Sequence, residues 1–461
     1  MAVPSRTRMP FRVAPLGATL LVVAMSAACH SPPAEPSNAP STPGHGSQSP
    51  VGSPEGATTE VPPSAVTAGR AGDLDLLLRE LVGTHPDPFV GEDPAAFEGR
   101  LEALAARADG LTGDAFLVEV MRLVGGRDRD GHTGLVPFAQ DAAGLTAWPL
   151  ALYDFEEGLY VVDALEPLRD LVGLRLVEIG GRPVEAVAEA VTPLVSRDNA
   201  GTVRARLPGY LVVPEVLRGL DLLPDRAPAL TFERADGTRV EHTPEPVPIR
   251  EWVTWRNVFY PLVPMTLPDD DDGPRHLRHR GEHFWSEQVG GALYVGYHQV
   301  QSGTASGDTI SGLARDVAAA FAGGDVTKVI VDIRGNPGGD NFTYPPLRDA
   351  LIRQAEADPG SVVVLIGRST FSAAGNFATE LRAEPGIRFV GEPTGAAPNL
   401  WGDADVVTLP FSKLVVHVAT RAWVFAPDDD ALAVEPDVAV PVRWADYAAG
   451  VDAALDAALA D

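Results

Sequence analysis

The chain has 461 residues, which is enough for about two or three folded units. Hydrophobic residues make up 45% of it, as in a globular protein with a sizeable core, and the formal net charge is −27. Only two lysines are present, Lys328 and Lys413. Nucleic-acid binding needs clustered cations that release counterions from phosphates, so this composition argues against a nucleic-acid partner.

The N-terminus has the pattern of an export signal. Arginines at positions 6, 8 and 12 precede an apolar run over 13–25, and small residues then lead to Cys29, the only cysteine. The pattern resembles a bacterial lipoprotein signal, although Ser26 stands where such signals usually carry leucine. We expect a signal peptide over 1–28, lipid attachment at Cys29 and a location in the bacterial cell envelope. Plain secretion and a retained membrane anchor are the alternatives.

Two segments of different composition follow this signal. Residues 29–70 are rich in Pro, Ser, Gly, Ala and Thr, and they lack the large apolar residues needed to offset the entropy of ordering. We expect a flexible tether there. Residues 71–145 carry three stretches of helical hydrophobic periodicity, so they predict an N-terminal helical subdomain.

Residues 146–250 are expected to be mostly strands. A strand, a glycine turn and a second strand over 172–184 lead into a helical run over 184–194, which resembles the middle of a PDZ-type module. Such a module would hold a substrate's C-terminal segment as an added strand. Residues 251–290 are expected to be a linker. His276, His279 and His283 in it have the spacing of a metal site, but neighbouring arginines oppose a dication, so no metal is expected.

Residues 291–461 alternate strand and helix patterns and predict an α/β core, closed by a helix over 444–459. An unbroken apolar strand pattern ends in the glycine-rich sequence DIRGNPGG at 332–339. A phosphate loop is excluded there, because no Gly-Lys-Ser/Thr follows. We expect Asp332 and Arg334 to hold the strand end by ion pairing.

Ser372 begins a predicted helix directly after the next strand pattern. The first N–H groups of a helix are unused by the helix and can stabilise an oxyanion, so Ser372 is a candidate nucleophile. The alternative is a serine that only caps the helix. The pattern differs from the G-x-S-x-G elbow, because Thr370 occupies the position of the first glycine.

The segments DIRGNPGG (332–339), TFSAA (370–374), VGEPTG (390–395) and EPD (435–437) together resemble the tail-specific, or carboxyl-terminal processing, serine protease family. The resemblance implies a crotonase/ClpP-like α/β protease core with Ser372 as nucleophile. It also implies oxyanion donors at the N–H groups of Ala373 and of one glycine of the GG pair, foremost Gly338. It implies no metal and no organic cofactor.

The chain departs from the best-known branch of that family, which uses a Ser-Lys dyad. The lysine position falls on Ala397, 25 residues after Ser372 (397 − 372 = 25). His132, in the sequence DGHTG, instead stands where the tricorn-like branch carries its catalytic histidine. In that branch a glutamate orients the histidine, and the matching position here is Asp430. The neighbouring acidic residues Asp428, Asp429 and Glu435 are alternatives, as is an exposed acidic turn without catalytic function.

The sequence therefore predicts a serine-type peptidase that cleaves envelope proteins or peptides through an acyl-enzyme. Ser372 would attack the carbonyl, and His132 would take and return the proton. Two alternatives remain: a non-catalytic protein that binds peptides or apolar ligands on the same fold, and an esterase that uses the same residues.

Overall fold

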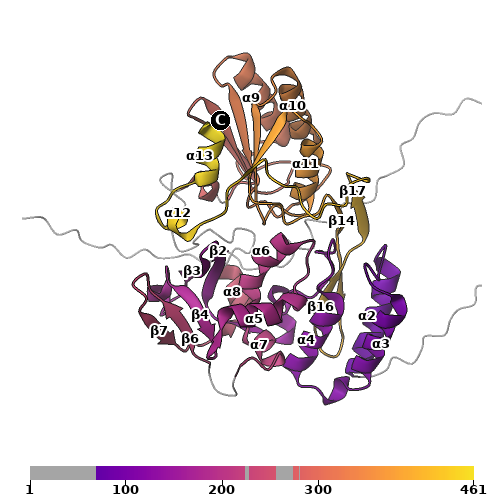
Figure 1. The fold of residues 1–461 in the computed structure, drawn as a ribbon. Helices are drawn as coiled ribbons and strands as arrows, with labels where there is room; N and C mark the ends of the chain where they lie inside the picture. Colours follow the sequence, from indigo (N-terminus) through magenta and orange to yellow (C-terminus); the bar gives the residue numbers. More distant parts are fainter. Residues whose placement is uncertain (1–68, 224–227, 256–273, 280, 461) are drawn as a thin grey trace, which may run out of the picture.

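The computed structural model describes residues 69–223, 228–255, 274–279 and 281–460 (Figure 1). The expected signal peptide, Cys29 and nearly all of the tether lie outside the described residues. Within the described ranges, no helix combines the length and apolar character needed to cross a bilayer.

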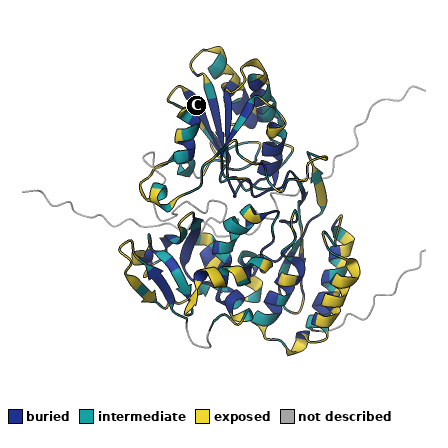
Figure 2. Ribbon diagram, in the orientation of Figure 1, coloured by how far each residue is buried: buried dark blue, intermediate teal, exposed yellow. Residues whose placement is uncertain are grey.

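The described part of the chain begins with three helices that pack around a shared apolar interior, as the periodicity predicts. Asp93 and Thr112 cap the second and third helices, each accepting a hydrogen bond from a backbone N–H three residues on. Their outer faces are exposed, especially on the first two (Figure 2). The bounds are α2 Arg70–Thr84, α3 Pro94–Ala105 and α4 Gly113–Val124.

The next segment forms an antiparallel sheet with strand order β2-β3-β4-β6-β7, in which β5 pairs with β4. A separate short pair joins β1 to β8. The strands are β1 Thr146–Ala147, β2 Leu150–Phe155, β3 Gly158–Ala164, β4 Arg175–Ile179, β5 Arg182–Pro183, β6 Leu230–Glu233, β7 Arg239–His242 and β8 Val247–Pro248. The helices are α5 Val184–Val191, α6 Ala200–Tyr210, α7 Pro214–Gly219 and α8 Ile249–Trp255.

The prediction that this region is mostly strands was wrong at α6 and α7. Two glycines and Pro208 lie within α6 and weaken its helical pattern, so periodicity alone did not reveal it. The helix starts because Asn199 caps it, accepting a hydrogen bond of 3.0 Å from the N–H of Thr202. In Figure 1, α6 lies where the lower part of the molecule meets the upper part.

Strand addition at the β2 edge of this sheet is obstructed. Trp252 donates to the carbonyl of Leu150, and Arg368 donates to the carbonyl of Asp154 at 2.6 Å. Side chains thus occupy backbone acceptors that an added peptide strand would need.

The C-terminal part forms a twisted sheet with strand order β18-β13-β12-β11-β10-β9. Strands β10, β11, β12, β13 and β18 run parallel, and β9 is antiparallel to β10. The strands are β9 Phe284–Val289, β10 Ala292–Tyr297, β11 Lys328–Asp332, β12 Val362–Ile366, β13 Ile387–Gly391 and β18 Val438–Ala439. Strand β9 belongs to the core sheet, although its residues fall in the stretch expected to be a linker.

Helices cover both faces of this sheet, and its central strands are buried (Figures 1 and 2). Alternate residues of β11 point to opposite faces, so Val329 packs with α9, α10 and α11 and Ile330 packs with α13. The expected C-terminal helix is divided in two, because Gly450 has φ 69° between the two halves. The bounds are α9 Ile310–Ala322, α10 Pro345–Ala357, α11 Ala373–Arg382, α12 Trp444–Ala448 and α13 Ala453–Ala460.

An arm, residues 399–424, leaves the core and runs down beside α2 (Figure 1). It consists of two antiparallel pairs, β14 with β17 and β15 with β16. Its strands are β14 Asn399–Gly402, β15 Asp405–Thr408, β16 Val415–Val418 and β17 Arg421–Val424. Buried Asp73 of α2 accepts hydrogen bonds from the N–H groups of Phe411 and Ser412 at 2.9 and 2.7 Å, which fixes the tip of the arm to the helical subdomain.

Phe377, at the centre of α11, is fully buried between Tyr297 and Tyr344. We expect Phe377→Ala to lower the free energy of unfolding by about 3–5 kcal/mol, because the cavity cannot close fully. Phe342→Ala is the matched control, since that ring is 63% exposed, and it should change stability by less than about 0.5 kcal/mol. Urea denaturation measures both, and equal losses would contradict this description of the core.

Candidate active site

Ser372 lies where β12 has ended and α11 begins. Its backbone is strained, with φ 53° and ψ −128°, a conformation that costs a non-glycine residue about 1–3 kcal/mol. Thr370 supports the turn by accepting a hydrogen bond from Gly367 and donating one to Ile333. The side chain of Ser372 makes no capping hydrogen bond, so the alternative of a helix-capping serine is wrong.

His132 reaches Ser372 across 240 residues of sequence, with 3.0 Å between Nε2 and Oγ. The loop that carries it is fixed to the arm on both sides. Gly134 and His417 exchange two backbone hydrogen bonds of 2.9 Å, and the N–H of Trp401 donates to the carbonyl of Arg129. The structure therefore brings together the two residues that the sequence singled out.

The surroundings of His132 favour the neutral imidazole. Burial, and then the positive charge of Arg206, lower its pKa from 6.5 to about 4, although Asp130 and the carbonyl of Trp401 act in the opposite direction. A neutral Nε2 can accept the proton of the serine hydroxyl, which is the requirement for a general base. The Trp401 carbonyl is near, but the buried Nδ1 forms no hydrogen bond of ordinary geometry with any described residue.

The structure does not bring Asp430 to the imidazole, which corrects the expectation for the third residue. The side chain of Asp430 is fully exposed and lies 3.7 Å from the guanidinium of Arg129. The nearby Asp429 caps its own turn, accepting a hydrogen bond from Ala431. This stretch is the acidic turn that was the alternative interpretation, and none of its carboxylates orients His132 in this geometry.

The structure also disagrees with the expectation that Gly338 supplies an oxyanion donor. The N–H of Gly338 is already used, because it donates to Oδ1 of Asn336 at 2.9 Å. Among the described residues, the N–H groups of Gly339 and Ala373 donate to no protein acceptor, and they remain available to a ligand. Gly338 is needed for another reason: a Cβ there would lie 2.6 Å from the Cβ of Ser372.

A lysine dyad is excluded by the positions of both lysines. Lys413 donates to the carbonyl of Pro410 at the tip of the arm, and Lys328 donates to the carbonyl of Ala458. Ala397, the expected lysine position, is fully buried, and its N–H donates to Asp198. With no lysine at the site, His132 is the group in contact with Ser372 that could accept its proton.

Asp198 is a residue of the site that sequence reasoning missed. It is fully buried and accepts hydrogen bonds from the N–H groups of Gly131 at 2.7 Å and Ala397 at 3.2 Å. Burial raises its pKa to about 7, against the lowering effect of these hydrogen bonds and of Arg206. No sequence signal pointed to it, since it stands in an ordinary loop before an unrecognised helix.

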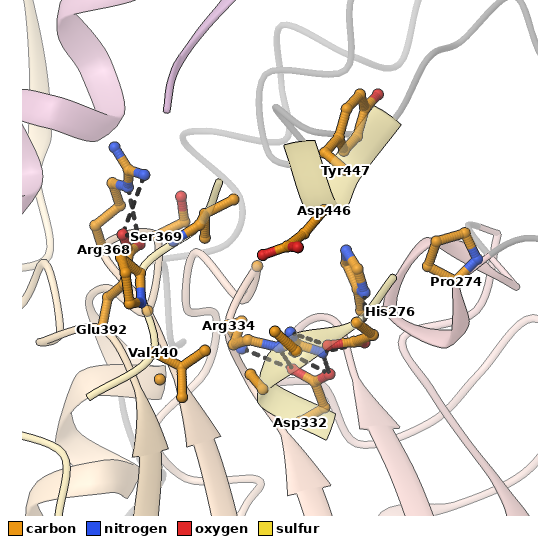
Figure 3. A pocket seen from close by; sticks show the side chains of 18 of the residues that line it. Pro274, His276, Asp332, Arg334, Arg368, Ser369, Glu392, Val440, Asp446 and Tyr447 are labelled. Carbon is orange, nitrogen blue, oxygen red and sulfur yellow. Dashed lines mark hydrogen bonds and ion pairs between the residues drawn. The ribbon is translucent and has the colours of Figure 1, made fainter. Parts of the chain in front are cut away.

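The cavity shown in Figure 3 lies apart from this site. It has a volume of about 100 Å³ at the carboxyl ends of the parallel strands, and neither Ser372 nor His132 lines it. Arg334 lies at its base and donates to both Asp332 and Asp452, as expected for a residue that holds the strand end. Burial opposes ionisation of Asp452, but Arg334 and His276 hold its pKa well below the ordinary value.

The three histidines considered for metal binding are not gathered around a common point. His276 hydrogen-bonds to Asp452 at 2.9 Å, and His283 to the carbonyl of Gly303 at 2.7 Å. Across the residues that the structure describes, no group of three or more His, Cys, Asp or Glu side chains is arranged to hold a metal ion.

Comparisons with known proteins identify the fold. No protein-family model and no curated protein matches the sequence. Among solved structures, mature CPAF in complex with lactacystin aligns over 82% of this chain and 95% of its own, with 15% identity and a TM-score of 0.56. The photosystem II D1 C-terminal processing protease aligns over 80% of this chain and 93% of its own, with 15% identity and a lower TM-score of 0.35. The chain thus has an α/β fold like that of CPAF. The crotonase/ClpP-like core and the PDZ-like insert stay predictions.

The lowered pKa of His132 can be measured directly. We expect its imidazole resonances, assigned by their loss in His132→Gln, to titrate near about 4 rather than 6.5. An unfolded histidine binds its proton at the higher pH, so burial of the neutral ring costs stability as the pH falls from 6.5 toward 4. Comparing unfolding of wild type and His132→Gln at several pH values tests the sign. A midpoint at or above 6.5 would contradict the described environment.

Proposed function

We propose that this protein is a serine-type peptidase that hydrolyses peptide bonds of envelope proteins or peptides. The observation that carries the proposal is the 3.0 Å contact between Nε2 of His132 and Oγ of Ser372. A serine hydroxyl is a weak nucleophile unless a base accepts its proton, and this contact supplies the base.

The proposed mechanism assigns a step to each of these groups. Ser372 attacks the carbonyl carbon while its proton moves to Nε2 of His132, and the carbonyl oxygen becomes an oxyanion. The N–H groups of Ala373 and Gly339 stabilise that charge. In other enzymes, a single such donor accelerates the reaction by a factor of about 10²–10³. His132 then gives the proton to the leaving amine, and the bond to nitrogen breaks. Water, activated by the same histidine, releases the acyl group and restores Ser372.

Two alternatives use the same fold. A non-catalytic binding protein would need no base, so the pairing of a strained serine with a neutral histidine favours catalysis. An esterase would use the same residues, and only substrate profiling separates the two. The family resemblance in the sequence favours a peptidase, and the CPAF-like fold is compatible with it.

The decisive test is labelling of Ser372 by a fluorophosphonate probe, followed by cleavage of a peptide panel. We expect wild type to be labelled at Ser372, Ser372→Ala to be unlabelled, and His132→Gln to react about 10²–10⁴-fold more slowly. The labelling rate should stay constant as the pH is lowered and fall only near about 4, where His132 gains a proton.

Asp430→Asn is the matched control, because the structure places that carboxylate in solvent, and it should label within about twofold of wild type. A folded wild-type protein that is not labelled at Ser372 would overturn the proposal in favour of the binding protein. Labelling with ester hydrolysis but no peptide hydrolysis would favour the esterase.

We also propose export and lipid anchoring at Cys29, on the sequence pattern alone. In a bacterial host that processes lipoproteins, the full chain should incorporate labelled palmitate and sediment with membranes. Cys29→Ser should abolish both and leave fluorophosphonate labelling unchanged, because the anchor is remote in sequence from Ser372. Palmitate incorporation that persists in Cys29→Ser would refute this assignment.

A further inference from the structure

The start of α6 is connected by hydrogen bonds to the turn that carries Ser372. Thr202 and Asn199 each donate a side-chain hydrogen bond to the loop after β13, to the carbonyls of Gly395 and Thr394 respectively. That loop in turn donates to the carbonyl of Thr370, two residues before Ser372, through the N–H of Ala396. Three hydrogen bonds therefore connect the beginning of α6 to the turn that bears the nucleophile.

One turn further along α6, Arg206 contacts the histidine side of the site. Its Nη1 donates to the carbonyls of Gly131 at 2.8 Å and Ser196 at 2.7 Å. Its guanidinium also lies over the ring of Phe371, 4.6 Å from the ring centre. Phe371 stacks on the imidazole of His132, with ring centres 4.7 Å apart and planes inclined by 23°.

Placing the charged guanidinium of Arg206 at this site costs desolvation free energy. The guanidinium is partly buried, and its two side-chain hydrogen bonds go to neutral carbonyls rather than to a carboxylate. Burial lowers the pKa of Arg206, although Tyr210 and Asp198 act against that lowering. The two residues that Arg206 contacts each precede a residue of the candidate site. Gly131 precedes His132, and Phe371 precedes Ser372.

We propose that Arg206 is a positioning residue of the active site, which holds the His132 loop through Gly131 and the nucleophile turn through Phe371. The inference rests on the proposed function, because positioning matters only if His132 and Ser372 react. It assigns a role in catalysis to the region 146–250, whose helix α6 carries Arg206.

The charge of Arg206 gives this role a signature that a structural contact would lack. The groups that act on His132 are Arg206 and His417, which lower its pKa, and Asp130 and the Trp401 carbonyl, which raise it. Removing the charge in Arg206→Met therefore raises the pKa of His132. Arg206→Lys keeps a positive charge on a side chain of different shape, so it leaves that pKa nearly unchanged. Burial is the larger cause, so the rise stops short of 6.5.

The test uses the full-length chain with Arg206→Met, Arg206→Lys and, as a matched control, Arg204→Met. Arg204 lies on the same helix but pairs with Asp154 near the surface. For each variant, the midpoint of the His132 imidazole titration and the rate of fluorophosphonate labelling are measured. The titration needs no reaction, so it still reports on Arg206 if Ser372 proves unreactive.

We expect Arg206→Met to raise the His132 midpoint and to slow labelling by about tenfold to a hundredfold, since small misplacements of reacting groups have effects of that size. Arg206→Lys should keep the midpoint and recover part of the rate, because a lysine keeps the charge but loses the planar fork. Arg204→Met should match wild type in both measurements.

Arg206→Met with an unchanged midpoint, or with an unchanged rate, overturns the proposal. If Arg206→Met does not fold, Arg206→Lys decides: a kept midpoint with slower labelling supports positioning, and a wild-type rate overturns it. If wild type itself is not labelled at Ser372, the proposed function fails, and a raised midpoint in Arg206→Met then shows only that Arg206 sets the charge state of His132.

Discussion

The two backbone hydrogen bonds between Gly134 and His417 join the parts of the molecule that carry His132 and Ser372. His132 belongs to the N-terminal subdomain and Ser372 to the core, so their contact depends on how these parts are held together. The arm connects these parts. Its strand β14 hydrogen-bonds to Arg129, on the N-terminal side of His132, and its strand β16 hydrogen-bonds to Gly134, on the C-terminal side. Gly134 is suited to this joint, because it has φ 152° and any Cβ would collide with Ser196. A single pair of ladder bonds contributes about 1–3 kcal/mol, which is modest, so the additional tie from Asp73 to the tip of the arm matters.

The turn that carries Ser372, by contrast, is held within the core by the glycine-rich loop and the strand that precedes that loop. Asn336 connects the loop to its surroundings: its side chain donates to the carbonyl of Tyr297 and accepts from Gly338, and its carbonyl accepts from Phe371. This network consumes the N–H of Gly338 and leaves that of Gly339 free. The turn at Ser372 is thus supported by neighbouring loops of the same core sheet, while the His132 loop depends also on contacts with the arm.

This difference explains what the sequence could and could not predict. Ser372 directly follows one strand pattern and begins a helix pattern, so its place in the fold could be predicted from the sequence, and the family resemblance then singled it out as the candidate nucleophile. His132 was found through resemblance to a family and through the lack of a nearby lysine. Asp430 was misplaced because sequence order says nothing of where an exposed turn points. The choice between Gly338 and Gly339 depends on one side-chain hydrogen bond. Asp198 lies in the loop before α6 and Arg206 within α6, and the glycines and proline of that helix obscured its pattern in the sequence.

The same contacts show why a histidine rather than a lysine suits this site. The N–H of Ala397, at the lysine position of the related dyads, is held by Asp198, which already interacts with Arg206. A lysine there would add a second cation beside a partly buried guanidinium, next to the Asp198 carboxyl with which that guanidinium already interacts. Desolvating two like charges around one partner is unfavourable, whereas a neutral imidazole needs no counter-charge until it takes a proton. In the proposed mechanism the imidazolium forms together with the oxyanion, whose charge adds to the stabilisation that Asp130 and the Trp401 carbonyl give. In the proposed mechanism, this arrangement favours the ion pair of the tetrahedral intermediate over a charged histidine in the resting protein.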